Sequence, residues 1–424
     1  MSIFDASQLM FNNPSFYDGV ATQSLNINGN GYLSIQHDTA PTLATKGTVA
    51  FWIKLHNNDD RNYVINTTGG SSNNTTMDIR FGGSNTNDGM HIGQYGRTPY
   101  TASTTGPKQR DLSAWYHCLV SFDSTSSTAS ERQMKIFING VQVTAGTFGA
   151  ISQNDLFPFT QQTHAIRIGR HISVGYYLDA YLADFYIIDG QALTPDNFAE
   201  IKEGICIPKA YEGTYGNNGI RLEFKGTGTA TSSGVVSSPT NIGDDSSGNN
   251  NHFAVTTLSA HDSNMQDSPE NNFPTFFPIF KTHTGVISWI NNSVTFSEGN
   301  LRVNLNTSNE TQSGAFATFT VPTSGKWYWE ILCIAEASTS ISGTGVIEAS
   351  TGTYIRSASN TSGRTYGAGD IINVAFDADN NRIFFGINGT FPADQTPTDS
   401  SDGTAATGSD YLPYVWGNHG GSAN

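Results

Sequence analysis

Short runs in which apolar and polar residues alternate recur along this chain, separated by Gly, Asn and Ser. Within residues 47–55, Val49, Phe51, Ile53 and Leu55 occupy every second position. Successive side chains of a β-strand point to opposite faces, so these four residues lie together on one face. Closely spaced strands of this kind are typical of antiparallel sandwiches and jelly rolls. The pattern therefore predicts an all-β fold.

The same alternation predicts further strands in the first half of the chain, at residues 32–35, 62–66, 76–81, 89–95, 115–122, 135–143, 164–169 and 178–188. The Asn-Gly pairs at residues 139–140 and 388–389 predict type I′ hairpin turns, because both residue types tolerate positive φ. One short helix is expected at residues 194–202, which open with Thr-Pro-Asp, a favourable N-cap and first turn.

The charge balance limits the classes of partner. The chain has 21 Lys and Arg against 36 Asp and Glu, a formal net charge of −15. Binding to a phosphate backbone requires clustered Lys and Arg, so we do not expect a nucleic-acid partner. Charged residues make up only 13% of the chain. Much of the remaining polarity comes from Ser, Thr, Asn and Gly, which is typical of strands and turns.

The cysteines and the N-terminal residues predict a chain that is not exported by a signal of its own. Cys118, Cys206 and Cys333 are far apart and odd in number, so we expect buried thiols rather than a disulfide framework or a zinc site. The first residues lack the basic and apolar regions of a signal peptide, and no apolar run is long enough for a membrane span. Synthesis in a cytoplasm without membrane insertion is the expectation.

Three blocks in the first half of the chain carry a family resemblance. They are Phe51-Trp52-Ile53, the segment from Trp115-Tyr116-His117 to Asn139-Gly140, and Leu182-Ala183-Asp184-Phe185-Tyr186 continuing to Pro195. Residues 14–205 thereby resemble the laminin-G-like or concanavalin-A-like jelly roll. The last block also resembles a domain ending found in virion proteins of tailed bacteriophages.

Three blocks in the second half resemble the SPRY domain, in the same order and spacing. They are Gly325-Lys326-Trp327-Tyr328-Trp329-Glu330, Gly369-Asp370-Ile371-Ile372 continuing to Asp377, and Ile383-Phe384-Phe385 continuing to Gly389. The final residues fall one strand short of a complete SPRY domain, which implies either an abbreviated tail or a strand added by a partner subunit.

These resemblances imply two antiparallel β-sandwich domains joined by an irregular bridge rich in Gly, Ser, Asn and Pro. The expected organisation is an N-terminal anchor segment at 1–13, a jelly-roll domain at 14–205, the bridge at 206–280 and a SPRY-like domain at 281–424. The bridge contains one candidate strand, at residues 219–224.

The chain lacks the sequence patterns of the common catalytic sites. Glycosidases of the concanavalin-like fold place two carboxylates a few residues apart on one strand, and no run of the Glu-x-Asp-x-Glu type occurs. A Gly-x-Ser-x-Gly elbow, a His-Glu-x-x-His motif and a phosphate loop are also missing from the sequence. Glu330 fits the SPRY pattern better than a catalytic role. We therefore expect a protein that is not an enzyme.

Two kinds of ligand site remain possible from the sequence. Asp244, Asp245 and Asn249 offer the oxygen ligands that calcium prefers, although an Asx-rich turn has the same sequence. Exposed aromatic rings stack on sugars, although the same rings can pack on their own sheet. The candidate sugar-binding residues are Tyr95, Arg97, Tyr100, Tyr176 and Tyr177.

The resemblance to phage proteins implies a structural component of a virion. The leading hypothesis is a tail fibre or tail-attached receptor-binding protein that contacts a host surface glycan or protein and forms a homo-oligomer, most simply a trimer. A head-decorating or connector-associated virion protein is one alternative. A free lectin-like adhesin or degenerate glycan hydrolase is another.

Overall fold

The structure is a computed structural model, and the described residues form two compact units, 16–273 and 274–419. The described ranges are 16–57, 61–68, 76–82, 89–94, 102–104, 109, 111–132, 134–147, 151–162, 164–233, 240–277, 294–297, 299–305, 313–335, 340–358 and 366–419.

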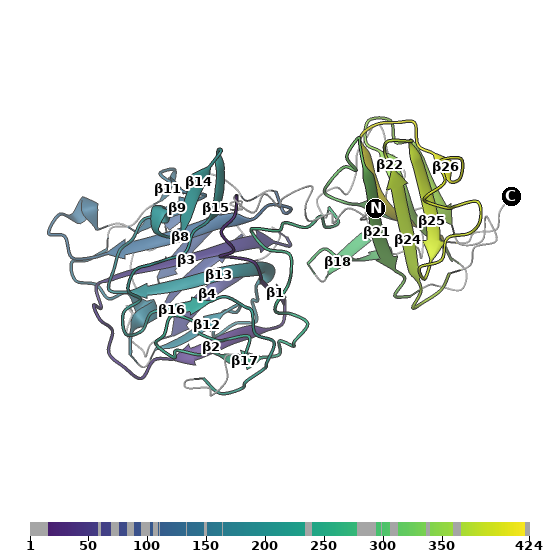
Figure 1. Ribbon diagram of the computed structural model, residues 1–424. Coiled ribbons are helices and arrows are strands. Elements are labelled where there is room, and N and C mark those ends of the chain that lie inside the picture. Colours follow the sequence, from purple (N-terminus) through teal and green to yellow (C-terminus); the bar gives the residue numbers. More distant parts are fainter. Residues whose placement is uncertain are drawn as a thin grey trace. The chain divides into compact units, whose positions relative to one another are not determined.

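The N-terminal unit is built around two large antiparallel sheets (Figure 1). The seven-stranded sheet has the order β1(Leu25–Asn28), β13(Asp179–Asp189), β3(Lys46–Leu55), β8(Tyr116–Asp123), β9(Lys135–Ile138) and β10(Val141–Gln142), with β16(Ile220–Leu222) also paired to β13. The eight-stranded sheet has the order β11(Gly146–Thr147), β7(Ala102–Thr104), β6(Met90–Gln94), β5(Met77–Phe81), β4(Asn62–Thr68), β12(Ala165–Ile168), β2(Tyr32–Gln36) and β17(Ala254–Thr256).

One apolar core joins these sheets and confirms the all-β prediction. Val49, Phe51, Ile53 and Leu55 of β3 belong to the same buried cluster as Ile166 and its neighbours from the eight-stranded sheet. The alternation in β3 therefore faces the inside of a sandwich. The predicted hairpin turn is also present, since Asn139 and Gly140 have φ of 49° and 79°.

The opposite face of β3 is buried as well, which the alternation did not predict. Residues 47–55 are all buried. Ala50 packs in a second cluster with Tyr186, Phe198 and Tyr211, and Trp52 packs in a third. A further layer of chain therefore covers the outer side of the seven-stranded sheet.

Residues 198–273 supply much of that layer. The expected helix at 194–202 is wrong: a 3-10 turn at Pro195–Asn197 is followed by β14(Ala199–Lys202), which pairs with β15(Ile205–Pro208). Pairing of β14 with β15 satisfies backbone groups that a helix would otherwise satisfy internally. Phe198, between the turn and β14, is buried.

The sequence predicts a separate bridge at residues 206–280. In the structure, the described residues of this segment up to residue 273 belong to the N-terminal unit instead. It is irregular for most of its length, yet β16 extends one sheet and β17 extends the other. The candidate strand at 219–224 is present as β16. Backbone pairing with both sheets thus makes this segment part of the jelly roll.

A buried ion pair fixes the end of that segment. Lys54 Nζ donates to Asp267 Oδ2 at 2.7 Å, and the two side chains are 1% and 4% exposed. Lys54 also donates to Asn272 Oδ1 and to the carbonyl of Phe273, while Trp115 Nε1 donates to Asp267 Oδ1 at 3.0 Å. Burial lowers the pKa of Lys54, and the Asp267 carboxylate opposes that effect.

The C-terminal unit contains two four-stranded antiparallel sheets and one hairpin. One sheet has the order β20(Ser313–Phe316), β27(Tyr411–His419), β22(Ser340–Glu348) and β23(Tyr354–Ala358), and the other has β21(Lys326–Leu332), β24(Ile371–Asp377), β25(Arg382–Ile387) and β26(Thr404–Ala405). The hairpin joins β18(Val294–Ser297) and β19(Arg302–Leu305). Residues of both sheets share one core cluster.

The three sequence blocks of the second half become neighbours in this unit. They form β21, β24 and β25, which lie side by side in one sheet. Asn388 and Gly389 have the positive φ of the predicted turn. The last described strand, β27, lies between β20 and β22 rather than at a sheet edge.

The cysteines follow the prediction in part. No disulfide forms among the described residues, and Cys118 is buried. Cys206 and Cys333 are partly exposed, contrary to the expectation that all three are buried.

Replacement of Asp267 by Ala should strongly destabilise the N-terminal unit. The variant leaves the Lys54 ammonium buried without its carboxylate, which costs about 3–5 kcal/mol of unfolding free energy. The matched control is Asp123→Ala, which breaks the half-exposed Lys46–Asp123 pair and should cost about 1 kcal/mol or less. Equilibrium urea unfolding measures both, and equal losses would contradict a special role for the buried pair.

Candidate functional site

In the eight-stranded sheet, the pairing of the strands places polar residues in a row across one face. Directly paired residues of antiparallel strands share a face, and pairing aligns Ser34, Arg167, Asn66 and Asp78. The next residue along β12, Ile168, belongs to the core. The polar row therefore lies on the face turned away from the seven-stranded sheet.

Arginines and aromatic rings gather on and beside this row, and we call this group the arginine face. It comprises Arg61, Arg80, Arg167, Arg170, Tyr32, Tyr63, Tyr176, Tyr177 and His171.

One half of the arginine face is centred on Tyr63, which is buried. The guanidinium carbon of Arg80 lies 5.5 Å from the centroid of its ring. Tyr176 stacks on Tyr63 at 6.0 Å between centroids, and Arg61 lies 5.2 Å from the centroid of Tyr176. The ring of His171 meets Tyr63 edge-on at 4.7 Å.

The other half is centred on Tyr32 of β2. The guanidinium carbons of Arg167 and Arg170 lie 4.9 Å and 5.3 Å from its ring centroid, and Arg170 lies 4.9 Å from that of Tyr177. Hydrogen bonds with Thr256 and Arg170, together with the charges of both arginines, lower the pKa of Tyr32. Among the described residues neither arginine forms an ion pair, and Nε of Arg170 lacks a hydrogen-bond partner there.

The loop at residues 169–178 carries Arg170 and both predicted tyrosines. Its first residue, Gly169, has a φ of 95°, a left-handed conformation that favours glycine. The backbone N–H of Ile172 donates to Asn66 Oδ1, and Nη1 of Arg167 donates to the Ile172 carbonyl, both at 3.0 Å. These bonds hold the loop against β4 and β12.

Positive charge dominates the electrostatics of this face. Burial lowers the pKa of His171, and the charges of all four arginines add to that effect. The carboxylate of Asp78 belongs to the polar row of this face, and Arg80 Nη1 donates to its Oδ1 at 2.5 Å. Burial raises the pKa of Asp78 to about 6, although Arg80 opposes the shift. A Cβ atom at Gly93 would lie 2.5 Å from Asp78 Oδ2, so a glycine makes room for this carboxylate.

Residues 28–199 match a laminin G family model, described as the concanavalin A-like lectin/glucanases superfamily. The N-terminal unit therefore contains a concanavalin A-like jelly-roll domain. The matched residues include every arginine of the arginine face. No protein with a curated description is similar enough in sequence to match the chain.

Several solved structures are similar to parts of the chain. A heptameric SAP-like pentraxin from Limulus polyphemus is 15% identical, with 41% of this chain and 78% of the pentraxin covered and a TM-score of 0.30. Domains LG4-5 of the mouse laminin α1 chain are 10% identical, with 95% and 82% covered and a TM-score of 0.30. The CBM40 of Ruminococcus gnavus IT-sialidase, bound to α2,3-sialyllactose, is 13% identical, with 41% and 94% covered and a TM-score of 0.27.

The predicted sugar-binding residues divide into two groups. Tyr176 and Tyr177 belong to the arginine face, where both are half-buried and contact arginines. Tyr95, Arg97 and Tyr100 lie outside the described residues.

The predicted calcium ligands form a tight loop in the N-terminal unit. The Asp245 carboxylate accepts backbone N–H groups from Arg221, Ser247 and Asn251. The side-chain amide of Asn249 donates to the carbonyls of residues 216 and 219, and Asp244 accepts the N–H of residue 241. This is the geometry of the Asx-rich turn, and calcium binding stays a prediction. Across the described residues no group of three or more His, Cys, Asp or Glu is arranged to hold a metal ion.

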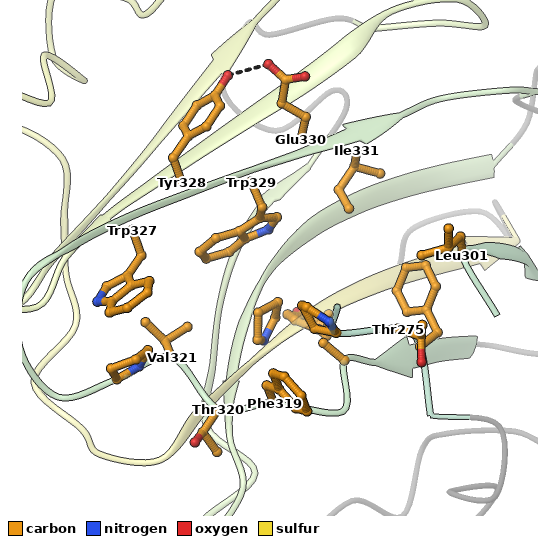
Figure 2. Close-up of a pocket in the computed structure, with 16 residues that line it drawn as sticks. Thr275, Leu301, Phe319, Thr320, Val321, Trp327, Tyr328, Trp329, Glu330 and Ile331 are labelled. Carbon is orange, nitrogen blue, oxygen red and sulfur yellow. Dashed lines mark hydrogen bonds between the residues drawn. The ribbon is translucent and has the colours of Figure 1, made fainter. Parts of the chain in front are cut away.

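The C-terminal unit has a pocket of about 280 Å³ beside β21, with a largely apolar lining (Figure 2). Figure 2 shows Trp327 and Trp329 directed toward the side of Val321, whereas Tyr328 and Glu330 lie on the other side of the strand. The Tyr328 hydroxyl donates to Glu330 Oε1 at 2.6 Å. The described lining includes no Lys, Arg or His, so the pocket and the arginine face differ in chemistry.

Membrane insertion was not expected from the sequence. The described part of the chain contains no helix long and apolar enough to cross a membrane.

The raised pKa of Asp78 predicts a specific dependence of stability on pH. Its folded pKa of about 6 exceeds the ordinary value of 3.8, so the folded state binds the proton more tightly. The contribution of Asp78 to stability is therefore complete below the unfolded pKa and is lost as pH rises through the folded pKa. On lowering the pH from about 7 to about 5, the wild type should gain about 1 kcal/mol relative to Asp78→Asn. Urea unfolding of both proteins at the two pH values measures this difference, and parallel pH profiles would contradict it.

Proposed function

We propose that this chain is a non-enzymatic structural component of a phage virion, a tail fibre or tail-attached receptor-binding protein that recognises a host-surface glycan through its jelly roll. The observation that carries the glycan part is the arginine face. Aromatic rings offer the apolar surface on which a pyranose stacks, and guanidinium groups donate hydrogen bonds to its oxygens. The concanavalin A-like fold of the N-terminal unit is compatible with this role.

The virion part of the proposal rests on the sequence resemblance of residues 182–195 to phage proteins. A homo-oligomer, most simply a trimer, and contacts with other virion proteins belong to the same proposal. The C-terminal unit, with its SPRY-like blocks on β21, β24 and β25, would then contact a protein or a neighbouring subunit. A free lectin-like adhesin uses the same face for the same chemistry and differs only in its location.

Glycan binding should depend on Tyr177. We expect the purified chain to bind a subset of a bacterial-polysaccharide array, and Tyr177→Ala to weaken that binding about tenfold through loss of the ring and of its contact with Arg170. The matched control is Tyr354→Ala in the C-terminal unit, because Tyr354 also carries an arginine, Arg356, 4.4 Å from its ring centroid. A flat array, or equal losses in the two variants, would remove the glycan part of the proposal.

The location of the chain tests the virion part independently. Antibody-labelled electron microscopy of purified phage particles should place the chain on the tail. Labelling of the head would favour the head-decorating or connector-associated alternative. Absence of the chain from purified particles would leave a free adhesin and exclude the virion role.

A further inference from the structure

We propose that the arginine face selects an acidic polysaccharide, whose carboxylate or sulfate group is bound by Arg167 and Arg170. This inference rests on the proposed glycan-binding function and adds the chemical class of the ligand.

Arg167 and Arg170 both contact the ring of Tyr32. Both guanidinium carbons lie within 5.3 Å of the Tyr32 ring centroid, so a single ring holds both charges near each other. Within the described part of the chain no carboxylate forms an ion pair with either one. Two like charges held on one ring, without a paired carboxylate, form a local site for an anion.

Each of the two guanidinium groups has a hydrogen bond within the protein. Arg167 has one N–H committed to the Ile172 carbonyl, and Arg170 has a hydrogen bond with Tyr32. Nε of Arg170 is a buried atom without a hydrogen-bond partner among the described residues, so the edge that faces a ligand is that of the terminal nitrogens. A guanidinium stacked on a ring keeps its N–H groups at its edge, where they can donate in parallel to two oxygens of one carboxylate or sulfate.

The rest of the protein carries a net negative charge, in contrast to the arginine face. A net charge of −15 repels a polyanion at long range. Charges farther than about 8 Å are largely screened at physiological ionic strength, so contacts at the arginine face outweigh that repulsion. The four arginines of the face are among 21 Lys and Arg in the chain, a strong local concentration in an acidic protein.

The pair of arginines distinguishes a neutral sugar from an acidic one. A neutral sugar has hydroxyl groups to accept from the guanidiniums and a ring to stack on Tyr177, but it leaves both positive charges uncompensated. An acidic sugar satisfies the same contacts and also neutralises the charges with stronger, charge-assisted hydrogen bonds. The observed pair of arginines therefore favours the acidic sugar.

The test uses the full chain and three defined polymers: polygalacturonate, which carries carboxylates, dextran sulfate, which carries sulfates, and neutral dextran. Calorimetric titration should show binding to at least one polyanion, weakening with added salt, and weaker or no binding to dextran. Binding to polygalacturonate alone would identify the carboxylate as the recognised group, and binding to dextran sulfate alone would identify the sulfate.

Arg167→Gln/Arg170→Gln should weaken polyanion binding at least tenfold, since each variant position loses a charge-assisted hydrogen bond. The matched control is Lys135→Gln/Lys225→Gln, which removes the same two charges from exposed positions and should change the affinity less than twofold. Arg167→Lys/Arg170→Lys keeps the charge but loses the paired donors, and we expect an intermediate loss. Thermal unfolding of each variant checks that the jelly roll is intact.

The possible failures are distinguishable. Equal losses in the arginine and lysine variants would overturn the proposed anion site. Binding to neutral glycans of an array, with no binding to either polyanion, would also overturn it and leave the proposed glycan-binding function standing. No binding to any saccharide would remove both proposals.

Discussion

The burial of β3 on both faces is the constraint on which the N-terminal unit depends. One face packs into the sandwich core, and the other requires a cover that a two-layer sandwich does not provide. The chain supplies this cover itself, from β14 to the ion pair of Lys54 with Asp267. An unpaired buried charge is far more costly than a missing surface contact. The pair therefore specifies where the covering segment ends as well as stabilising it.

This cover also decides which face of the jelly roll is available for recognition. The outer side of the seven-stranded sheet is occupied by apolar side chains of the chain's own later residues, such as Phe198 and Tyr211. On the eight-stranded sheet the corresponding side bears polar and aromatic residues in register. The asymmetry of the two outer faces is thus a consequence of where residues 198–273 pack.

Much of the fold could be predicted from local patterns, because strand periodicity and Asn-Gly turns act over a few residues. The alternation of Val49 to Leu55 and the turn at 139–140 are examples of this. Local patterns could not identify the second buried face of β3, since Lys54 looks like a solvent-facing residue until Asp267, from a distant part of the chain, is placed beside it. The helix expected at 194–202 failed for a related reason, because pairing with β15 outweighs a favourable helix start.

The candidate site was predictable only in part. Tyr176 and Tyr177 stood out as adjacent aromatics in a glycine-containing loop, whereas Arg167 looked like an ordinary polar position of an alternating strand. Its partner Tyr32 belongs to a strand much earlier in the chain, and only the pairing of β12 with β2 brings them together. Sequence patterns report the face on which a residue lies but not which distant residue shares it.

The composition of the arginine face has an energetic cost that stacking offsets. The guanidinium carbons of Arg167 and Arg170 lie 4.9 Å and 5.3 Å from one ring centroid, so they are at most about 10 Å apart. Their repulsion is then at least about 0.4 kcal/mol in water and at least about 1.7 kcal/mol at the effective dielectric of a protein surface. Each contact of a guanidinium with a tyrosine ring contributes about 0.5–1 kcal/mol in the opposite direction. Arg167 and Arg170 make three such contacts, with Tyr32 and Tyr177. The stacked rings therefore hold the two charges in place without neutralising them, and the neutralising charge is left for a ligand to supply.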